Sequence, residues 1–352
     1  MSQATFGSPI LYLNNKEIPY NSISYNNDGS NKATRIQVST GATDLSESKL
    51  FGSKVKLYLN AGSLDDVPFF IGIIRQVSPS DNKVSFTALD VLGLLSGNQA
   101  GKLQLTDAKN YDGYTIGQFL QSYIEEFVNV KETLIGLDML NDSYPAASLT
   151  NIRGEFTPLS LVSKVTKLDT TNIRDVKSYR VGVINDAVKS NIVFFKEQSL
   201  DDSGIIFNLN KGIRNISYTV RNPPNLITGK AGDLGTKYVH NTAASGTVVK
   251  NINTPKGFKD PADFHDIAFY VATKEESVQE ISITVDKGYY LDIGNVISIQ
   301  IPSFPEVNGK HRIMAKRLNI SKAGLSCTLK LNKELPQVEN YLSSGDVRNV
   351  SR

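Results

Sequence analysis

Apolar and polar side chains alternate in four successive runs within residues 281–331, and Gly, Pro, Asn or Asp residues separate the runs. The runs cover residues 281–285, 296–301, 311–320 and 325–331. The last run is the most regular, because every second residue from Leu325 to Leu331 is apolar. Alternation with a period of two between turn residues is typical of antiparallel strands with one face in a core. This part of the chain therefore predicts an antiparallel meander.

A similar order of runs occurs about 240 residues earlier. Residues 54–59, 69–77 and 84–89 correspond in order to the second, third and fourth runs of the C-terminal part. In both places a loop with Pro precedes the middle run and a tight turn precedes the last. We interpret the two parts as one small β-module used twice. Because any two antiparallel meanders share turn residues, this interpretation depends on the order of the loops and not on sequence identity.

Helical patterns appear between the two modules. Thr115 and Gln118 form a capping box, and apolar residues then recur at spacings of three and four as far as residue 128. A second helix is expected to begin at Thr157-Pro158, because Pro suits the first helical position. Two strands are expected next, at residues 179–184 and 192–196. These patterns predict a small α+β unit.

The predicted fold class is α+β and mainly β, with two similar small β-barrel modules flanking an inserted α+β unit. A chain of 352 residues is too long for one compact core and predicts two or three domains. Residues 229–259 predict a hairpin or a long exposed loop, and residues 260–272 a helix. The expected divisions are a first module at 1–97, the inserted domain at 98–212, a second module at 213–335 and a flexible tail at 336–352.

The composition excludes several classes of protein. There are 38 basic and 35 acidic residues, and no Lys and Arg cluster is interleaved with aromatic residues, so a dedicated nucleic-acid face is not expected. The single cysteine, Cys327, excludes an internal disulfide and is predicted to be a buried apolar residue. Neither a signal peptide nor an apolar run of 18 residues is present, so we expect synthesis in the cytoplasm and no membrane span.

The sequence offers little catalytic chemistry. His240, His265 and His311 lack the spacing that lets one helix hold a metal ion, and no G-x-S-x-G motif occurs. The glycine-rich segment 229–235 lacks the G-K-[ST] ending of a phosphate-binding loop. Adjacent acidic residues are interpreted as solvated surface groups, and they are Asp65-Asp66, Asp201-Asp202 and Glu275-Glu276. We therefore expect no enzyme, no catalytic residue, no cofactor and no metal site.

In the order of its patterns, the chain resembles the baseplate or tail hub proteins of tailed bacteriophages and of related contractile injection systems. The resemblance covers about residues 50–335 in three stretches. The first stretch, at 55–90, is a strand, an F-x-G-x-I pattern with Phe70 and Gly72, a further strand and an Asp. The second stretch is the inserted unit, with its pair of helices and its pair of strands. The third is the C-terminal meander, with its Gly294-Asn295-Val296 turn. The Lys-rich segment 221–260 departs from the pattern.

The resemblance implies a structural virion protein of the tail or baseplate that acts in genome ejection. It implies a homotrimer, in which two modules in each chain give a ring of six similar units around a channel. Such a symmetry adaptor would join the six-fold tail tube to the three-fold central spike. The implied partners are tail tube or tube-initiator proteins, the spike protein and a tape-measure protein, with DNA only as passing cargo and no stable membrane association.

Candidate interface residues lie on two strands that we expect to form exposed sheet edges. They are Val55, Leu57 and Leu59 on the first strand, and Val296, Ile297, Ile299 and Ile301 on the second. The loop 229–259 and the tail 337–352 are expected to reach a neighbouring subunit. Three alternatives stay open at this point: a hexameric distal-tail or tube-initiator protein, a tail-associated carbohydrate-binding protein, and a glycan hydrolase that would use Asp65 or Asp201. The absence of Trp counts against a carbohydrate-binding aromatic platform.

Overall fold

Strands predominate in the computed structural model of the chain, and the mainly-β prediction is confirmed. Within the described residues, α2 (Val91–Leu94) is a short α-helix and Pro305–Val307 forms one turn of 3-10 helix. No helix in the described part of the chain is long and apolar enough to cross a membrane. The structure describes residues 9–29, 32–41, 50–59, 67–80, 83–95, 103–105, 118, 122, 135–138, 154–157, 159–160, 179–185, 190–196, 202–209, 212–220, 226–231, 236–240, 249–254, 278–286, 288–322 and 324–331.

The N-terminal module is an antiparallel sheet in which neighbours pair in the order β3-β4-β7-β6-β5-β1-β2. Its strands are β1 (Ile10–Leu13), β2 (Lys16–Glu17), β3 (Ser22–Asn27), β4 (Arg35–Thr40), β5 (Lys54–Tyr58), β6 (Phe70–Ser80) and β7 (Lys83–Leu89). Alternate residues on β7 are buried, as the sequence pattern predicts: Val84, Phe86 and Ala88 face the core. Burying such side chains stabilises the sheet by about 1.5–3 kcal/mol for each large apolar residue.

The C-terminal module pairs its strands in the order β14-β18-β21-β20-β19-β13. These strands are β13 (Asp202–Phe207), β14 (Ile213–Val220), β18 (Val278–Val285), β19 (Val296–Ile299), β20 (Gly309–Ser321) and β21 (Gly324–Leu331). The order matches β3-β4-β7-β6-β5-β1 strand for strand, so β14 corresponds to β3 and β20 to β6. One difference is that β13 runs parallel to β19, whereas β1 is antiparallel to β5.

Local contacts repeat along with the strand order. Gly52 N donates to Ile74 O at 3.0 Å and Ile74 N to Ser53 O at 3.0 Å; the matching bonds are Gly294 N to Ile313 O at 2.8 Å and Ile313 N to Asn295 O at 2.9 Å. Both glycines have positive φ, 81° and 96°, which glycine adopts readily. A register shift follows Ile74 in β6 and Ile313 in β20. The sequence Ile-Ser-Tyr recurs on β3 and β14. The two modules are therefore alike in contacts as well as in strand order.

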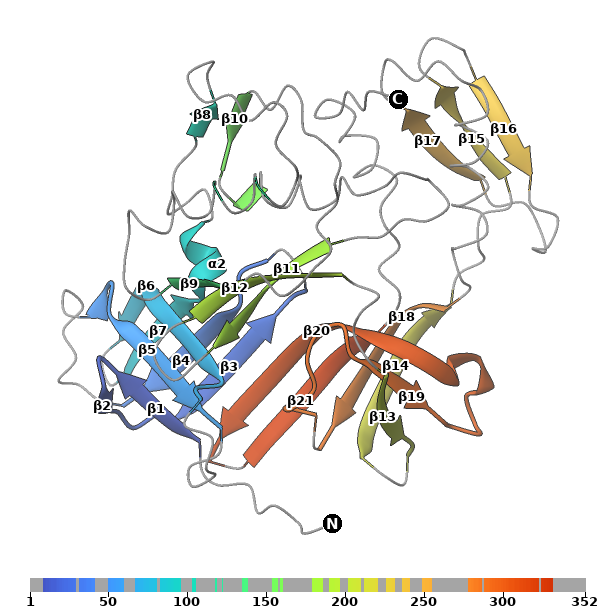
Figure 1. Ribbon diagram of the computed structural model, residues 1–352. Helices are drawn as coiled ribbons and strands as arrows, with labels where there is room; N and C mark the ends of the chain where they lie inside the picture. The colour runs from blue at the N-terminus through green and yellow to red at the C-terminus, as the bar shows by residue number, and fades with distance from the viewer. Residues whose placement is uncertain are drawn as a thin grey trace.

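The two modules share one sheet of 13 strands, because β3 pairs with β20. The register runs from Lys316 opposite Asn27 to Ser321 opposite Ser22. Figure 1 shows the blue N-terminal strands and the orange C-terminal strands meeting along this pair in one curved sheet. The buried apolar side chains of both modules belong to one continuous core cluster.

The inserted unit contains two small sheets. β8 (Leu103–Leu105) pairs with β10 (Gly154–Phe156), and β11 (Tyr179–Asn185) pairs with β12 (Ser190–Lys196), which confirms the predicted strand pair. β9 (Ile135–Asp138) pairs in parallel with β12, and the sequence did not predict it. Both predicted helices are confirmed where they are described, because Gln118, Ser122, Leu159 and Ser160 are helical. Thr157 Oγ1 accepts from Ser160 N at 3.1 Å at the start of the second helix, whereas Thr115 lies outside the described residues.

A third small sheet lies within the segment expected to be a hairpin or a long loop. β15 (Leu226–Ala231) and β16 (Thr236–His240) form the hairpin, and β17 (Val249–Thr254) pairs in parallel with β15. The segment is therefore a three-stranded sheet with more order than either expectation. The predicted helix at 260–272 and the tail at 336–352 lie outside the described residues.

Candidate functional site at the junction of the two modules

The junction depends on the length of β20, which pairs with two neighbours in succession on the same side. Its first four residues pair with β19, and its last six pair with β3. The register shift between Ile313 and Ala315 lies between these two parts. Lys316 is therefore the first residue of β20 to pair with the N-terminal module, at the point where the two modules meet.

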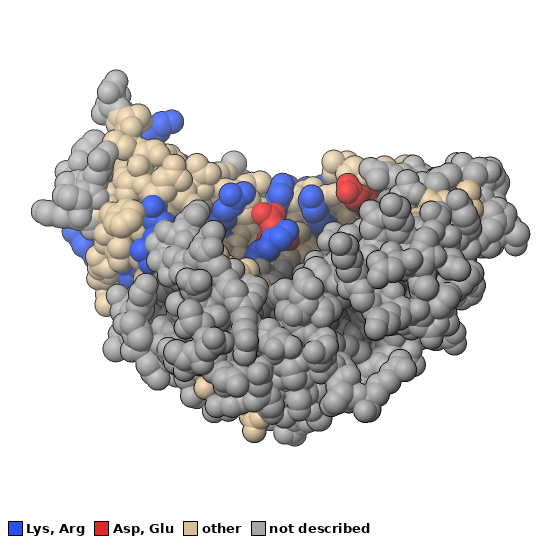
Figure 2. Space-filling view, turned by 90° about the horizontal axis from the view of Figure 1, so that it is seen from above, with Lys and Arg blue, Asp and Glu red and all other residues tan. Residues whose placement is uncertain are grey.

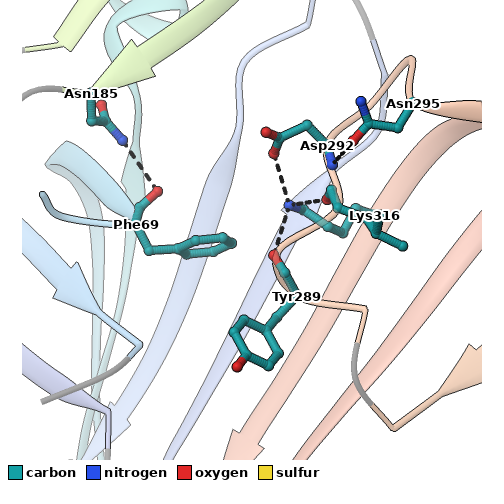
Figure 3. A network of polar contacts seen from close by, with 7 residues as sticks. Phe69, Asn185, Tyr289, Asp292, Asn295 and Lys316 are labelled. Atoms are coloured by element: carbon teal, nitrogen blue, oxygen red, sulfur yellow. Dashed lines mark hydrogen bonds and ion pairs between the residues drawn. The ribbon is translucent and has the colours of Figure 1, made fainter. Parts of the chain in front are cut away.

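Lys316 is a buried cation, with 2% of its side chain exposed. Its ammonium donates to Leu291 O at 2.7 Å and to Tyr289 O at 3.2 Å, and it lies 3.3 Å from Asp292 Oδ1 (Figure 3). The Asp292 side chain is 83% exposed, so Leu291 O provides the buried acceptor of this site and Tyr289 O a partly buried one. A buried charge is tolerated only when it is hydrogen-bonded or paired. The lysine thus holds the loop before β19 against β20.

The same ammonium also contacts the N-terminal module. It lies 5.0 Å from the ring centroid of Phe69 and 5.9 Å from that of Tyr25. The two rings pack against each other, with centroids 4.7 Å apart. Cation–π contacts of this kind contribute about 0.5–2 kcal/mol. Burial raises the pKa of the Tyr25 hydroxyl, which therefore stays neutral and adds no charge beside Lys316.

The inserted unit is attached to the same place through Phe69. Asn185 Nδ2 donates to Phe69 O at 3.2 Å (Figure 3). Ser190 Oγ in turn donates to Asn185 Oδ1 at 2.8 Å. Leu159 N also donates to Leu95 O at 2.8 Å, at the end of α2. Three parts of the chain therefore converge on the junction, where they fix the relative positions of the modules.

Asp90 is a second buried ionisable group, at the start of α2. Its carboxylate accepts from Thr34 N at 2.9 Å and from Gly93 N at 3.2 Å, so it caps the helix and ties β4 to β7. Burial raises the pKa of the Asp90 carboxyl to about 6, although these hydrogen bonds oppose the shift. The surroundings of Asp90 are those of a structural cap.

The face of the large sheet opposite the core is polar across both modules. The strand register places these residues in two rows, one of Ser326, Asn319, Ser24, Gln37, Thr87 and Gln76, and one of Gly324, Ser321, Ser22, Ser39, Ser85 and Ser78. We call this surface the polar face. Its charged residues include Arg35, Lys83, Lys330, Glu280 and Arg317, and Arg317 pairs with Asp28 at 3.1 Å. Figure 2 shows Lys and Arg side chains gathered along the hollowed side of the molecule.

The residues chosen from the sequence as interface candidates lie elsewhere than expected. Val55, Leu57, Leu59, Ile297, Ile299 and Ile301 are buried in the core, and Val296 is half-buried. β5 lies between β1 and β6, and β19 lies between β13 and β20, so neither strand is an open edge. The expected exposure of these edges is therefore wrong, because their inward side chains belong to the core of the chain itself. Contact between this chain and a second subunit stays a prediction. Strands other than β5 and β19 would have to provide the sheet edges for it.

Cys327, His240, His311 and Asp202 are the described members of the group of residues considered for chemistry. Cys327 is buried, and burial raises the pKa of its thiol to about 12, which confirms the prediction of an apolar role. His311 Nε2 lies 2.8 Å from Val307 O, His240 belongs to β16, and His265 lies outside the described residues. Asp65, Asp66, Asp201, Glu275 and Glu276 also lie outside them, and Asp202 begins β13. Within the described residues, no three His, Cys, Asp or Glu side chains are grouped so as to hold a metal ion.

Sequence reasoning missed Lys316, although a signal for it exists. Lys316 has the same alternation phase as Leu318 and Ile320, which face the core. A basic residue in the apolar phase of a strand predicts a buried ammonium with dedicated acceptors. The polar face could likewise have been found from the Ser, Thr, Asn and Gln residues in the opposite phase of the same strands.

Comparison with known proteins gives similarity at the level of structure. No family model and no curated protein matches the sequence. The tail protein from Neisseria meningitidis MC58 superimposes with a TM-score of 0.63 at 14% identity, covering 97% of this chain and 98% of that one. The 43 kDa tail protein of prophage MuSo2 from Shewanella oneidensis gives 0.66 at 13% identity, covering 92% and 98%.

A third similar structure comes from a secretion system. It is an Escherichia coli protein described as a component of the type VI secretion system with structural similarity to the T4 bacteriophage tail proteins gp27 and gp5. Its TM-score is 0.54 at 12% identity, and the match covers 93% of this chain and 77% of that one. The chain therefore has the fold of phage and prophage tail proteins, which is also that of this secretion-system component.

Proposed function

We propose that the chain is a structural component of a virion tail or baseplate, where it acts as a trimeric hub. Three chains would form a ring around a channel and join the six-fold tail tube to the three-fold central spike. The fold supports the tail assignment. The observation that supports the hub assignment is the recurrence of one strand order, β3-β4-β7-β6-β5-β1 and β14-β18-β21-β20-β19-β13, within a single sheet.

The duplication matters because of symmetry. Three copies of a chain with two similar modules present six similar units on one side of a ring and keep three-fold symmetry for everything else. Head-to-tail contacts between identical chains close into such a ring when the rotation between neighbours fits. The angle between the modules must then be fixed, and the β3–β20 pairing with Lys316 provides a rigid connection. A hexamer of this chain would carry twelve modules, which the six-fold tube does not require.

The polar face is the surface that we assign to the channel. Its two rows consist almost entirely of hydroxyl and amide side chains, which hydrate well without carrying charge. Binding of DNA through its phosphates strengthens with each cation that contacts one. The two rows carry no charge, and Arg317 on the same face is paired with Asp28, so we propose that a duplex passes along the rows without being held. DNA is thus proposed as passing cargo only.

The same proposal gives the chain its divisions and partners. We propose modules at 1–97 and 213–335 with the inserted domain at 98–212. The strands of the two modules fall within these limits except β13 (Asp202–Phe207), which precedes the second module in the chain and pairs with its strand β19. Tube or tube-initiator proteins would bind one side of the ring, and the spike protein the other, with a tape-measure protein as a further partner. The role is structural, without a catalytic step, and its location is the virion tail.

Native mass spectrometry of the purified chain tests the proposal. The expected result is a particle of three copies of the 38.6 kDa chain. Six copies would favour the distal-tail or tube-initiator alternative. A monomer at the highest concentrations tested would contradict a ring formed by this chain.

A further inference from the structure

We propose that the ring closes by pairing the outer edge of β14 in one protomer with the second half of β6, residues 76–80, in the next. The inference rests on the proposed trimer and identifies the surface through which a second copy of the chain binds. It follows from the internal duplication, because β3 already pairs with the second half of β20 inside each chain. β14 is the counterpart of β3, and β6 is the counterpart of β20.

Both strands have one open side in the described part of the sheet. β5 pairs with β6 only from Phe70 to Ile73, and among the described strands residues 76–80 pair with β7 alone. Gln76, Ser78, Pro79 and Ser80 are exposed. Pro within sheets is confined to edge strands and bulges, and it limits unwanted pairing at an edge. β14 pairs with β18, and it ends the described order of the large sheet.

Side-chain burial points to the same missing neighbour. On β3, Ile23 and Tyr25 are buried beside β20, at 1% and 6% exposure. Their counterparts in the repeated Ile-Ser-Tyr sequence, Ile216 and Tyr218, face the core but are only half-buried. Tyr218 packs against Phe304 with centroids 5.8 Å apart, as Tyr25 packs against Phe69. A strand added beside β14 would cover Ile216 and Tyr218 as β20 covers Ile23 and Tyr25.

An exposed aromatic residue lies on the complementary side of the N-terminal module. The loop that contacts Lys316 and ends at Gly294 precedes β19, and the counterpart segment that ends at Gly52 precedes β5. Phe51 lies in that segment and is 58% exposed. In the ring, Phe51 would approach the Tyr218–Phe304 pair of the neighbouring protomer. Large exposed aromatic side chains are characteristic of interface centres.

The register of the proposed pair can be derived from the internal one. The matched hydrogen bonds align Ile74 with Ile313, and the register shift follows at once in both strands. Ser80 then takes the place of Asn319, and Ser217 takes the place of Ser24, its partner on β3. Residues directly opposite each other on antiparallel strands have Cβ atoms about 4.5–5.5 Å apart. Two cysteines at such positions are close to the spacing of a disulfide.

Cysteine cross-linking tests this register in a chain whose one native cysteine, Cys327, is buried. The variant Ser80→Cys/Ser217→Cys should form covalent dimers and closed trimers under mild oxidation, seen on a non-reducing gel. The control is Ser85→Cys/Ser217→Cys, because Ser85 faces the same side from β7, one strand farther from the edge. The control should form no covalent oligomer.

Native mass spectrometry of the same samples separates the two proposals. Trimers without Ser80–Ser217 cross-links would overturn the edge assignment and leave the trimer intact. Equal cross-linking of the control would also overturn it. Monomers in the unsubstituted chain would contradict both the trimer and this edge. If the cysteine variant itself does not assemble, hydrogen exchange of the unsubstituted trimer replaces it: the amides of β14 and of residues 76–80 should become protected on assembly, and unchanged exchange would overturn the proposal.

Discussion

Replacing Lys316 by Met tests whether the buried ammonium holds the two modules together. The substitution keeps an unbranched apolar stem and removes the ammonium that donates to Tyr289 O and Leu291 O. Each buried carbonyl that loses its partner costs about 1 kcal/mol or more, and the lost cation–π contacts add about 0.5–2 kcal/mol. We therefore expect the free energy of unfolding to fall by about 2–4 kcal/mol.

Hydrogen exchange and urea unfolding measure this loss. Because 1.4 kcal/mol is a tenfold change in an equilibrium constant, amides of β3 and the second half of β20 should exchange roughly 30-fold faster or more. Urea unfolding followed by far-UV circular dichroism should show a lower midpoint. The matched control is Lys330→Met on the neighbouring strand β21, an exposed lysine whose loss should cost less than about 0.5 kcal/mol. Equal effects for the two variants would refute the junction role of Lys316.

Three further predictions concern single residues. Asp90→Asn should remove a pH dependence of the free energy of unfolding, measured by urea titration. The folded pKa of about 6 lies above the usual 3.8, so ionisation of Asp90 opposes folding. In the unsubstituted chain this carboxyl should therefore lower the stability as the pH rises from about 4 to about 6, and in the variant this contribution should be absent. Gly72→Ala should destabilise the fold by about 1–3 kcal/mol, because the added Cβ would lie 2.5 Å from Leu89 O. Gly41→Ala should be tolerated, because the nearest atom to its added Cβ is Asn21 Nδ2 at 3.7 Å. Thermal unfolding of the two variants compares them. Phe51→Ser should shift the trimer towards monomer in sedimentation without lowering the unfolding midpoint of the monomer, since the side chain is exposed; an unchanged association constant would count against its place in the interface.

The alternation of side chains predicted most strands of the two modules, but not β13, and the order of the loops predicted the duplication. Residues 325–331 and 84–89 alternate in the sequence, and their apolar side chains are buried in β21 and β7. Alternation identifies the face that a side chain occupies and leaves the neighbouring strand undetermined. For this reason the sequence did not predict the β3–β20 pair, whose residues are far apart in the chain.

The same limit explains the interface residues. Val55 and Ile297 alternate with polar residues because they face a core, and the strands that cover both sides of β5 and β19 come from other parts of the chain. β9 was not predicted from the sequence. β17 overlaps the weak periodicity at 247–252 in the segment expected to be a hairpin or loop, but its parallel pairing with β15 was not predicted. Lys316 was missed because only the apolar residues of β20 were used to identify its buried face. Lys316 lies on that same face, in alternation with Leu318 and Ile320.

The number of units around the ring tests the central claim most directly. Electron micrographs of the purified assembly, averaged along the ring axis, give its rotational symmetry and the number of lobes. The duplicated module predicts three-fold symmetry with six similar lobes around a central opening. Six-fold symmetry with twelve lobes, or an assembly without an opening, would contradict the account.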